Sequence, residues 1–409
     1  MDSALIPKGL KRCPFPQFAL WIGAWSFIML WAVIAAVIAW AYGLNTTNLN
    51  DYFGFGAWIT ADLAIIALGA GAFFTGFMRY VLGIDEFKNI LNYAVIIGFI
   101  CYSSALAILA LDIGQPLRGW FIFWHANVHS MLTEVAFCIS CYFTVLAIEY
   151  IPIILENRQL DKVPTFHAFS HNLHHIMAVF AATGAFLSFF HQGSLGGVAG
   201  VLFGRPFAFR VHASIWPTTF FLFIFSAIAC GPCFTILITR LTEAITRKKL
   251  VARNVILKLA MISGWLLVGY LSVKMLDTLY WAAVTLPKMG VNFFDMYPQA
   301  PFNLWILIAE LGICGAIPAA ILITKKTREN EFLLILAAIL NCTGICINRY
   351  VMTVQALALP VMPFDKFYNY VPNWIEWITS LAPFAFMAIL LSLSYRYLPI
   401  FPQEKELNP

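Results

Sequence analysis

The feature that most constrains this chain is a series of ten apolar stretches, separated by turn residues and charges. A helix needs about 20 apolar residues to cross the hydrocarbon core of a bilayer, and each stretch is close to or above that length. The expected spans are residues 18–42, 58–80, 90–112, 128–150, 174–192, 214–240, 257–284, 303–324, 332–354 and 374–398. The sequence therefore predicts an all-α integral membrane protein with ten transmembrane helices.

The composition excludes a soluble fold and several cofactor motifs. Only 11% of the 409 residues are charged, against about a quarter in soluble domains. The pairs Cys138/Cys141 and Cys230/Cys233 lack the histidine of a covalent haem motif, so we interpret them as packing residues. The glycine-rich segment 193–213 lacks the Lys-Ser/Thr of a phosphate loop, and it is predicted to be a compact outer loop.

The basic residues predict the orientation of the helices. If the N-terminus is inside, most Lys and Arg residues fall on inner segments, as the positive-inside rule requires. The outer segments and outer helix ends carry Arg118, Arg205, Arg210, Lys288, Arg349 and Lys366. We expect both termini to be cytoplasmic. The first stretch is too long for a signal-peptide core, so we interpret it as a retained anchor.

Polar residues inside the spans predict an internal repeat. Helices two to five and helices six to nine start on the same side, so a duplication would be parallel. The matched features are Leu111-Asp112 with Leu276-Asp277, Glu134 with Glu310, Thr183-Gly184 with Thr343-Gly344, and Arg79 with Arg240. The expected units are a first four-helix bundle, 58–192, and a second, 214–354. An N-terminal segment with the anchor helix, 1–57, and a last helix with a cytoplasmic tail, 355–409, flank them.

Several charged residues fall inside the apolar spans, where each costs about 2.5 to 3.5 kcal/mol on insertion scales and so needs a partner or a task. Asp62 and Glu134 lie in the outer half of the first bundle. In the second bundle, Lys274 with Asp277 and Glu310 with Arg349 are interpreted either as neutralising structural pairs or as part of a proton pathway.

The histidines gather at two depths. His129 and His191 lie near the outer face, in the same layer as Asp112 and Glu134, and Gln192 follows His191. A buried, titratable pocket of this kind suits a quinone head group, which needs donors to its carbonyls and a source of protons. Alternatively, His129 and His191 could hold a haem b.

His174 and His175 lie near the inner end of helix five. They are interpreted either as a partly solvated interfacial run or as a site of proton uptake from the cytoplasm, because histidine titrates near neutral pH.

Three short motifs resemble those of a known family. They are Leu-Asp-Ile-Gly-Gln-Pro-Leu-Arg-Gly-Trp at 111–120, followed by Asn127 and Ser130, Gly-Ala-Gly-Ala-Phe at 69–73, and His-Gln-Gly-Ser-Leu-Gly-Gly at 191–197. The chain thus resembles the NrfD/polysulfide-reductase family of quinone-interacting membrane subunits. Within it, the chain is most similar to the ten-helix branch, which includes membrane subunits of menaquinone reductase, hydrogenase-2 and alternative complex III.

The resemblance implies a function and partners. A bacterial inner-membrane subunit of this family carries no haem or iron-sulfur cluster of its own. It would take electrons from an extracytoplasmic ferredoxin-like iron-sulfur subunit, which implies a molybdopterin-oxidoreductase-like subunit and a multihaem cytochrome c as further partners and no nucleic acid. It would reduce menaquinone to menaquinol near the outer face. The predicted site is Asp62, Asp112, Arg118, His129, Glu134, His191 and Gln192. Of these, Asp112, Arg118 and His191 fall on the matched motifs, whereas Glu134 is supported by its position in the outer half of its helix.

Two points stay open at this stage. Another branch of the family often has a histidine where this chain has Asp62, so a direct role for that carboxylate departs from the pattern. The alternative functions are menaquinol oxidation in a related complex and secondary transport without redox chemistry. A proton pathway through His174, His175, Lys274, Asp277, Glu310 and Arg349 would make turnover move charge across the membrane.

Overall fold

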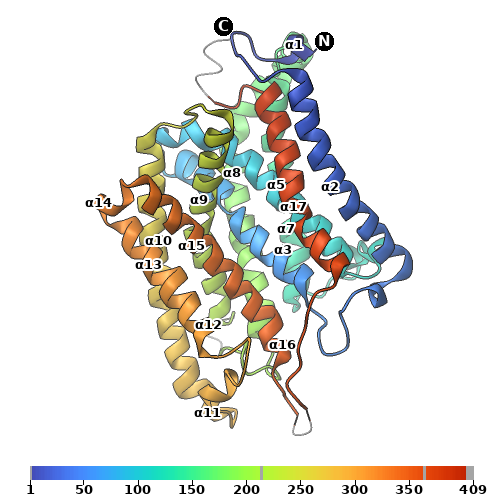
Figure 1. Cartoon of the computed structure of the whole chain (residues 1–409), viewed down its shortest axis with the longest axis vertical. Coiled ribbons are helices and arrows are strands. Elements are labelled where there is room, and N and C mark those ends of the chain that lie inside the picture. Colours follow the sequence, from blue (N-terminus) through green and yellow to red (C-terminus); the bar gives the residue numbers. More distant parts are fainter. Residues whose placement is uncertain (1, 212–214, 363–364, 402–409) are drawn as a thin grey trace.

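The computed structural model describes residues 2–211, 215–362 and 365–401 (Figure 1). These residues contain ten helical spans long and apolar enough to cross a membrane, which confirms the predicted fold class. The spans are Phe15–Tyr42, Ala57–Val81, Asp85–Asp112, Met131–Leu155, Pro164–Gly200, Thr218–Thr246, Arg253–Lys288, Leu304–Ile323, Glu331–Ala358 and Trp374–Tyr397. Helices dominate because a backbone inside lipid must satisfy its hydrogen bonds within its own segment.

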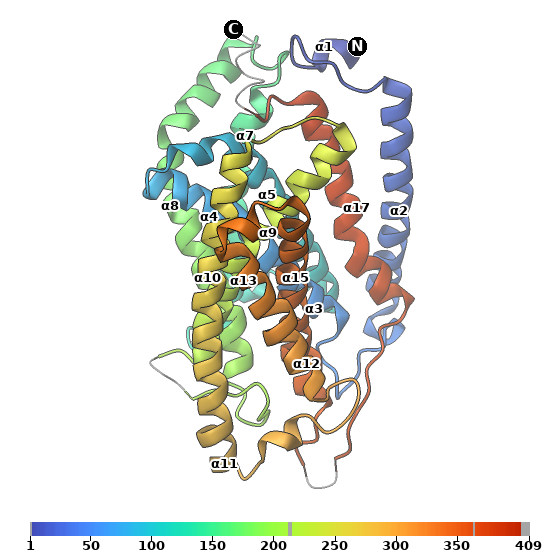
Figure 2. The same cartoon turned by 60° about the vertical axis from the view of Figure 1, so that its left-hand side comes forward.

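The helices form two groups and an outer pair. The first bundle comprises α3 (Ala57–Leu68), α4 (Gly71–Gly76), α5 (Lys88–Asp112), α7 (Met131–Leu155) and α8 (Pro164–Gly200). The second comprises α9 (Thr218–Thr246), α10 (Arg253–Tyr280), α12 (Leu304–Ile308), α13 (Ile317–Ile323) and α15 (Glu331–Tyr350). Helices α2 (Phe15–Tyr42) and α17 (Trp374–Tyr397) pack side by side at the edge (Figure 2).

Short helices complete the fold. Helix α1 (Asp2–Leu5) precedes the first span, α6 (Phe121–Trp124) and α14 (Lys325–Arg328) lie in connections, and α11 (Leu286–Lys288) and α16 (Ala356–Ala358) end the seventh and ninth spans. Helix α9 packs against α8, α4 and α3, so it joins the second bundle to the first.

Both ends of the described chain lie at one end of the molecule (Figure 1). The Arg396 guanidinium at the end of α17 binds the Asp2 carboxylate, with Nη2 and Oδ2 2.5 Å apart. We call this the terminal end and the opposite one the distal end. The positive-inside pattern predicts that the distal end faces outward.

The two bundles share local contacts. The Thr75 hydroxyl of α4 donates to the Gly71 carbonyl, and the Thr235 hydroxyl of α9 donates to the Gly231 carbonyl. Gly184 of α8 lies against Tyr142 of the preceding span, and Gly344 of α15 lies against Cys314 of its own preceding span. A parallel repeat predicts this correspondence.

The glycine-rich segment differs from its prediction as an outer loop. Helix α8 continues to Gly200, so only the part after Gly200 is a connection, and residues 212–213 of the predicted loop lie outside the described residues. A Cβ on Gly196 would come 2.3 Å from the Thr219 carbonyl oxygen, and one on Gly200 would come 2.1 Å from the Thr219 hydroxyl. The glycines therefore allow α8 to approach α9 closely, as small residues do between membrane helices.

Three spans of the second bundle contain π-helical segments. These are η5 (Trp281–Thr285), η7 (Ala309–Ala316) and η8 (Val351–Gln355). A π turn inserts one extra residue into a helix and frequently marks a functional site. Glu310 lies within η7, and Arg349 lies two residues before η8.

Candidate functional site

Gln192 is the centre of a polar cluster inside the first bundle. Its side-chain amide donates to the Ile66 carbonyl of α3 at 3.0 Å and lies 3.5 Å from the Tyr102 hydroxyl of α5. The Tyr102 and Ser188 hydroxyls are 2.9 Å apart. Ser188, His191 and Gln192 share one face of α8, because they are three and four residues apart. One face of α8 thus carries a row of polar groups into the bundle.

His191 is fully buried beside Tyr102, with ring centroids 6.0 Å apart. Neither ring nitrogen meets the geometry of a hydrogen bond to a described residue, although the Val135 backbone of α7 lies next to the ring. The Tyr142 hydroxyl likewise meets the geometry of no hydrogen bond to a described residue, although the Ser188 side chain lies next to it, and the Tyr142 ring is 4.5 Å from that of Tyr102. Burying such groups costs free energy unless something binds them.

Asp62 of α3 and Asp112 at the end of α5 are close enough to interact electrostatically. Asp62 is 3% exposed, and the Oδ1 atom of each carboxyl is buried without a partner among the described residues. Asp62 also lies within electrostatic reach of Tyr102. We name Asp62, Tyr102, Asp112, Tyr142, Ser188, His191 and Gln192 the first-bundle cluster.

The first-bundle cluster offers both hydrogen-bond donors and proton carriers. Tyrosine and amide groups can donate to a carbonyl, and carboxyl and imidazole groups can hold or release a proton. Buried polar groups without partners in a native protein require an explanation such as a ligand or an ordered water. The arrangement therefore suits a flat, polar-headed substrate that gains or loses protons.

An apolar cleft of about 300 Å³ opens near the cluster, between α2, α5 and α17. Its lining includes Ser104, whose hydroxyl has no partner among the described residues, and Thr379. The Trp58 indole of α3 donates to the Thr379 hydroxyl at 2.6 Å, and Trp58 is one turn from Asp62. Thr379 and Trp58 therefore connect the wall of the cleft to Asp62 of the first-bundle cluster.

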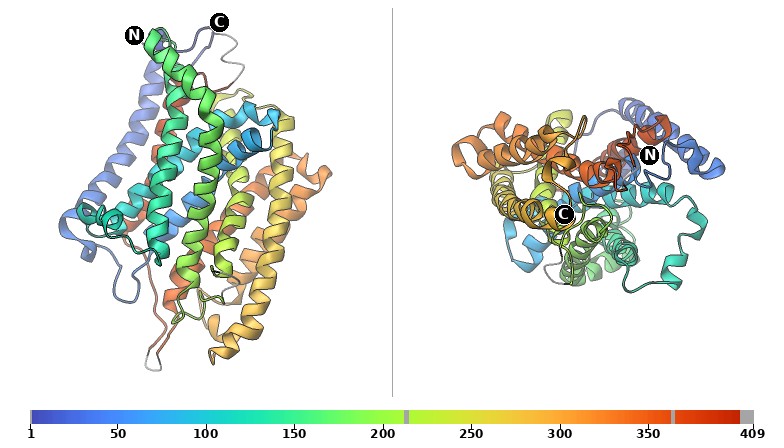
Figure 3. Two further views of the ribbon diagram at one scale, coloured as in Figure 1. Left: turned by 180° about the vertical axis from the view of Figure 1, so that it is seen from behind. Right: turned by 90° about the horizontal axis from the view of Figure 1, so that it is seen from below.

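The remaining predicted site residues are not part of the first-bundle cluster. Arg118 and His129 are exposed on the segment between α5 and α7, which projects to one side at the distal end (Figure 3). Glu134 is half-buried in the first turn of α7, near Cys138. His129 and His191 therefore occupy unlike environments, one exposed and one buried. Among the described residues, no group of three His, Cys, Asp or Glu side chains could hold a metal ion.

The second bundle contains a network of buried charges. Lys274 Nζ lies 3.8 Å from Glu310 Oε1, which also accepts a hydrogen bond from the Asn348 amide at 2.9 Å. The Asn348 side-chain oxygen in turn accepts from Arg349 at 2.7 Å. The Arg349 guanidinium stacks 3.6 Å from the Phe223 ring centroid.

The predicted ion pairs in this bundle were wrong. Asp277 pairs with Arg210, from Nε to Oδ2 at 2.9 Å, and accepts a hydrogen bond from Thr218. Lys274 pairs with Glu310 on another helix instead of with Asp277. Arg349 reaches Glu310 only through Asn348. The side chains pair with neighbouring elements, because a cation and an acid one turn apart on a helix gain little compared with a buried pair across helices.

The inner histidines lie in the terminal half of α8. His174 Nε2 is 3.0 Å from Glu156 Oε1, and His175 Nε2 is 3.1 Å from His171 Nε2. These side chains are exposed. They do not contact the first-bundle cluster or the charge network.

Several residues of both sites escaped the sequence prediction. Ser188 could have been found, because it shares a helical face with His191 and Gln192. No sequence feature distinguishes Tyr102 and Tyr142 from the other tyrosines of the chain, which has 15 in all. Glu376 also went unnoticed: it is fully buried at the start of α17, where it caps the helix and binds Tyr370. Burial and the Glu376 hydrogen bond both raise the pKa of the Tyr370 hydroxyl.

Comparison with known proteins identifies the family. The family described as "Polysulphide reductase, NrfD" matches residues 45–360, which include the first-bundle cluster and the charge network. The chain belongs to the NrfD family. The match covers most of the chain, so the resemblance expected from the three short motifs is confirmed.

Relatives of this NrfD protein are membrane subunits of oxidoreductases. It is 57% identical to the "Menaquinone reductase, integral membrane subunit" of Nitratidesulfovibrio vulgaris, over 100% of this chain and 98% of the relative. It is 23% identical to a subunit of the selenate reductase of Mesobacillus selenatarsenatis, over 94% of each chain. It is 25% identical to the "Probable Ni/Fe-hydrogenase 2 b-type cytochrome subunit" of Escherichia coli, over 89% of this chain and 88% of the relative. The protein is thus a quinone-interacting membrane subunit of a redox complex.

Proposed function

We propose that this NrfD protein reduces menaquinone to menaquinol at the first-bundle cluster. The observation that carries the proposal is a set of buried polar atoms on neighbouring helix segments that have no hydrogen bond among the described residues: Asp62 Oδ1, the Tyr142 hydroxyl, the His191 ring nitrogens and Gln192 Oε1. A quinone carbonyl could accept hydrogen bonds from the Tyr142 hydroxyl and a His191 N–H, and the hydroxyls of the quinol could donate to Gln192 Oε1 and Asp62 Oδ1. The near end-to-end similarity to a menaquinone reductase subunit supports the choice of quinone.

The reaction needs two electrons and two protons for each quinone. His191 and the Asp62/Asp112 pair are the groups that would deliver protons to the two carbonyl oxygens, while Gln192 and Tyr102 would hold the ring. The quinone would enter from the lipid through the cleft between α2, α5 and α17, whose lining is almost entirely apolar. A long isoprenoid tail would remain in that cleft.

The electrons would come from an extracytoplasmic ferredoxin-like iron-sulfur subunit at the distal end. The segment between α5 and α7 suits such a partner, because it exposes Leu117, Trp124 and Val128 there together with Arg118 and His129. Exposed apolar patches of this kind mark interaction surfaces. In this arrangement Arg118 and His129 contact the partner and not the quinone.

Proton movement is proposed for the second bundle. Lys274, Glu310 and Arg349 form a linked network beside the π turns η7 and η8. Such intramembrane charges mark proton relays in many membrane proteins. Turnover of the complex in liposomes would then create a membrane potential, and a double variant Lys274→Met/Glu310→Gln would reduce menaquinone without creating one. A potential that persists in the double variant would exclude the network as the pathway.

The test of the quinone site is substitution of His191 in the assembled complex. We expect His191→Ala to abolish reduction of a menaquinone analogue while the complex still assembles. His167→Ala is the matched control, because His167 is exposed in the first turns of α8, away from the cluster and from the proposed partner surface. Measurement of the reaction in both directions distinguishes menaquinone reduction from menaquinol oxidation. Normal turnover of the His191 variant would show that the site lies elsewhere.

A further inference from the structure

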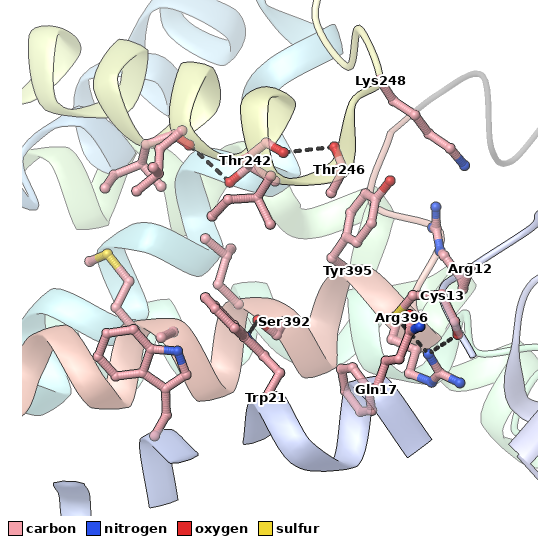
Figure 4. Close-up of a pocket in the computed structure, with 18 of the residues that line it drawn as sticks. Arg12, Cys13, Gln17, Trp21, Thr242, Thr246, Lys248, Ser392, Tyr395 and Arg396 are labelled. Atoms are coloured by element: carbon pink, nitrogen blue, oxygen red, sulfur yellow. Dashed lines mark hydrogen bonds between the residues drawn. The ribbon is translucent and has the colours of Figure 1, made fainter. Parts of the chain in front are cut away.

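A second cleft lies at the terminal end of the molecule, far along the helices from the first-bundle cluster. It has a volume of about 480 Å³ and is bounded by α2, α9 and α17. Figure 4 shows its lining residues on these three helices. Trp21, Leu241, Ile245 and Phe384 line it and are exposed by 38%, 55%, 57% and 60%. Because these large apolar side chains are exposed, the cleft opens onto the lipid-facing surface.

The part of the cleft between α2, α9 and α17 offers mainly apolar surface to a ligand. The Trp21 indole donates to the Ser392 hydroxyl at 3.0 Å. The Thr242 and Thr246 hydroxyls donate to carbonyls one turn earlier on α9. The polar groups of this part therefore have partners within the protein. A ligand here would meet mainly hydrocarbon and aromatic surface, which suits an acyl chain.

One end of the cleft is strongly basic. Lys11, Arg12 and Lys248 all line the cleft, and Figure 4 shows Arg12 and Lys248 at the same end of it. Lys248 Nζ donates to the Lys11 carbonyl at 3.0 Å, and the Arg12 guanidinium stacks 4.0 Å from the Tyr395 ring centroid. The charge of the fourth lining cation, Arg396, is balanced by Asp2. No acidic side chain is among the described residues that line the cleft.

We propose that this cleft binds an anionic phospholipid of the membrane leaflet at the terminal end. The acyl chain would lie among α2, α9 and α17, and the phosphate would lie against Lys11, Arg12 and Lys248. The volume is within the range of about 300 to 1,000 Å³ typical of ligand sites. Basic pockets between membrane helices on the cytoplasmic side recognise acidic head groups, and tryptophans such as Trp21 and Trp25 are enriched at that interface.

The chemistry favours a lipid over a soluble anion. A free phosphate would need only the basic end, and it would leave the apolar part of the cleft open. A neutral lipid would fill the apolar part but gain nothing from three cations. Only an acidic lipid matches both parts. Because the cleft separates α9 from the α2/α17 pair, the lipid would also join the peripheral helices to the second bundle.

The experiment uses the full chain in nanodiscs that contain equal amounts of phosphatidylglycerol and phosphatidylcholine, with the retained lipid measured by native mass spectrometry. The wild type should retain phosphatidylglycerol in preference to phosphatidylcholine. A Lys11→Gln/Lys248→Gln variant should weaken this preference by about tenfold or more, since each basic residue near the surface contributes about fivefold. The matched control is Lys249→Gln/Lys326→Gln, which removes two exposed terminal-end lysines that do not line the cleft. It should keep the preference.

Two further measurements distinguish binding of a lipid head group from binding of free inorganic phosphate. An Ala388→Phe variant fills the apolar part, and it should release the lipid even though all cations remain. Inorganic phosphate added to the wild type should not displace phosphatidylglycerol. Equal retention of both lipids by the wild type, or full retention by either the Lys11→Gln/Lys248→Gln or the Ala388→Phe variant, would overturn the proposal. Displacement by inorganic phosphate would overturn it as well, because the site would then bind a soluble anion.

Discussion

Gly71 of α4 and Gly231 of α9 lie against each other where the two bundles meet. A Cβ on Gly231 would come 2.2 Å from the Gly71 backbone nitrogen, and a Cβ on Gly71 would come 2.6 Å from the Gly231 carbonyl oxygen. In each helix a threonine four residues later, Thr75 or Thr235, donates to the carbonyl of that glycine. The contact therefore joins equivalent positions of the two bundles. It fixes how closely they approach.

This contact predicts a loss of stability when either glycine gains a side chain. Gly231→Ala should destabilise the protein by about 1 to 3 kcal/mol, because the new methyl group must push the two backbones apart. Thermal unfolding in detergent would measure the change. Gly269→Ala on α10 is the matched control, since a Cβ there has nothing within 4 Å. A variant of Gly231 as stable as this control would contradict the close contact.

Gln192 gives a second prediction, for the quinone site. Gln192→Leu keeps the approximate volume but removes the amide that bonds Ile66 and lies near Tyr102. We expect the catalytic efficiency with a menaquinone analogue to fall about tenfold, because a tenfold change corresponds to the free energy that one hydrogen bond typically contributes. Steady-state assays of the complex would measure it, with Gln159→Leu at the terminal end as the control. Unchanged efficiency would place Gln192 outside the substrate contacts.

The charge network predicts strong coupling between Lys274 and Glu310. Lys274→Met should destabilise the protein by about 3 to 5 kcal/mol, because it leaves the Glu310 carboxylate buried without its cation. The double variant Lys274→Met/Glu310→Gln should recover most of that stability, since no unpaired charge remains. Denaturation of the two single variants and the double variant gives the coupling energy. Additive effects in this cycle would mean that the pair does not interact.

Asp2 predicts a pH dependence for the attachment of the N-terminal segment. The hydrogen bonds from the Arg396 guanidinium hold the pKa of the Asp2 carboxyl below its ordinary value of 3.8. A lowered pKa means that the attachment is fully present above pH 3.8 and is lost only as the pH falls through the lower value. The protection factors of the amides in residues 2–13, which correct for the intrinsic pH dependence of exchange, should therefore be high at neutral pH and fall in strong acid. Asp2→Asn should give low protection factors at both pH values, and high protection in that variant would contradict the role of the ion pair.

The sequence predicted the spans well, because a bilayer imposes a simple length and polarity rule on each of them. Of the predicted site residues, Asp62, Asp112, His191 and Gln192 lie together in the first-bundle cluster; ionisable side chains stand out in a sequence because they are costly in an apolar span. Their role at a quinone site stays a prediction. The partner of Asp277 could not be predicted in this way. Arg210 follows the end of α8 and reaches Asp277 only through the fold of that connection. Similarly, the glycines of 193–200 are typical of a loop in the sequence, and only the packing of α8 against α9 explains them as part of a helix.

The length of α8 has an electrical consequence. Its 37 residues extend about 55 Å, whereas the hydrocarbon core is about 30 Å thick. The distal end of α8 reaches the first-bundle cluster, and its first turns lie toward the terminal end (Figure 3). A helix of this length that has its distal end in the core would extend beyond the core at the terminal end. With the first-bundle cluster placed inside the hydrocarbon core, the turns that carry His167, His171, His174 and His175 fall mostly outside the membrane's electric field. Charge that moves along this part of α8 would then perform little work against the transmembrane voltage.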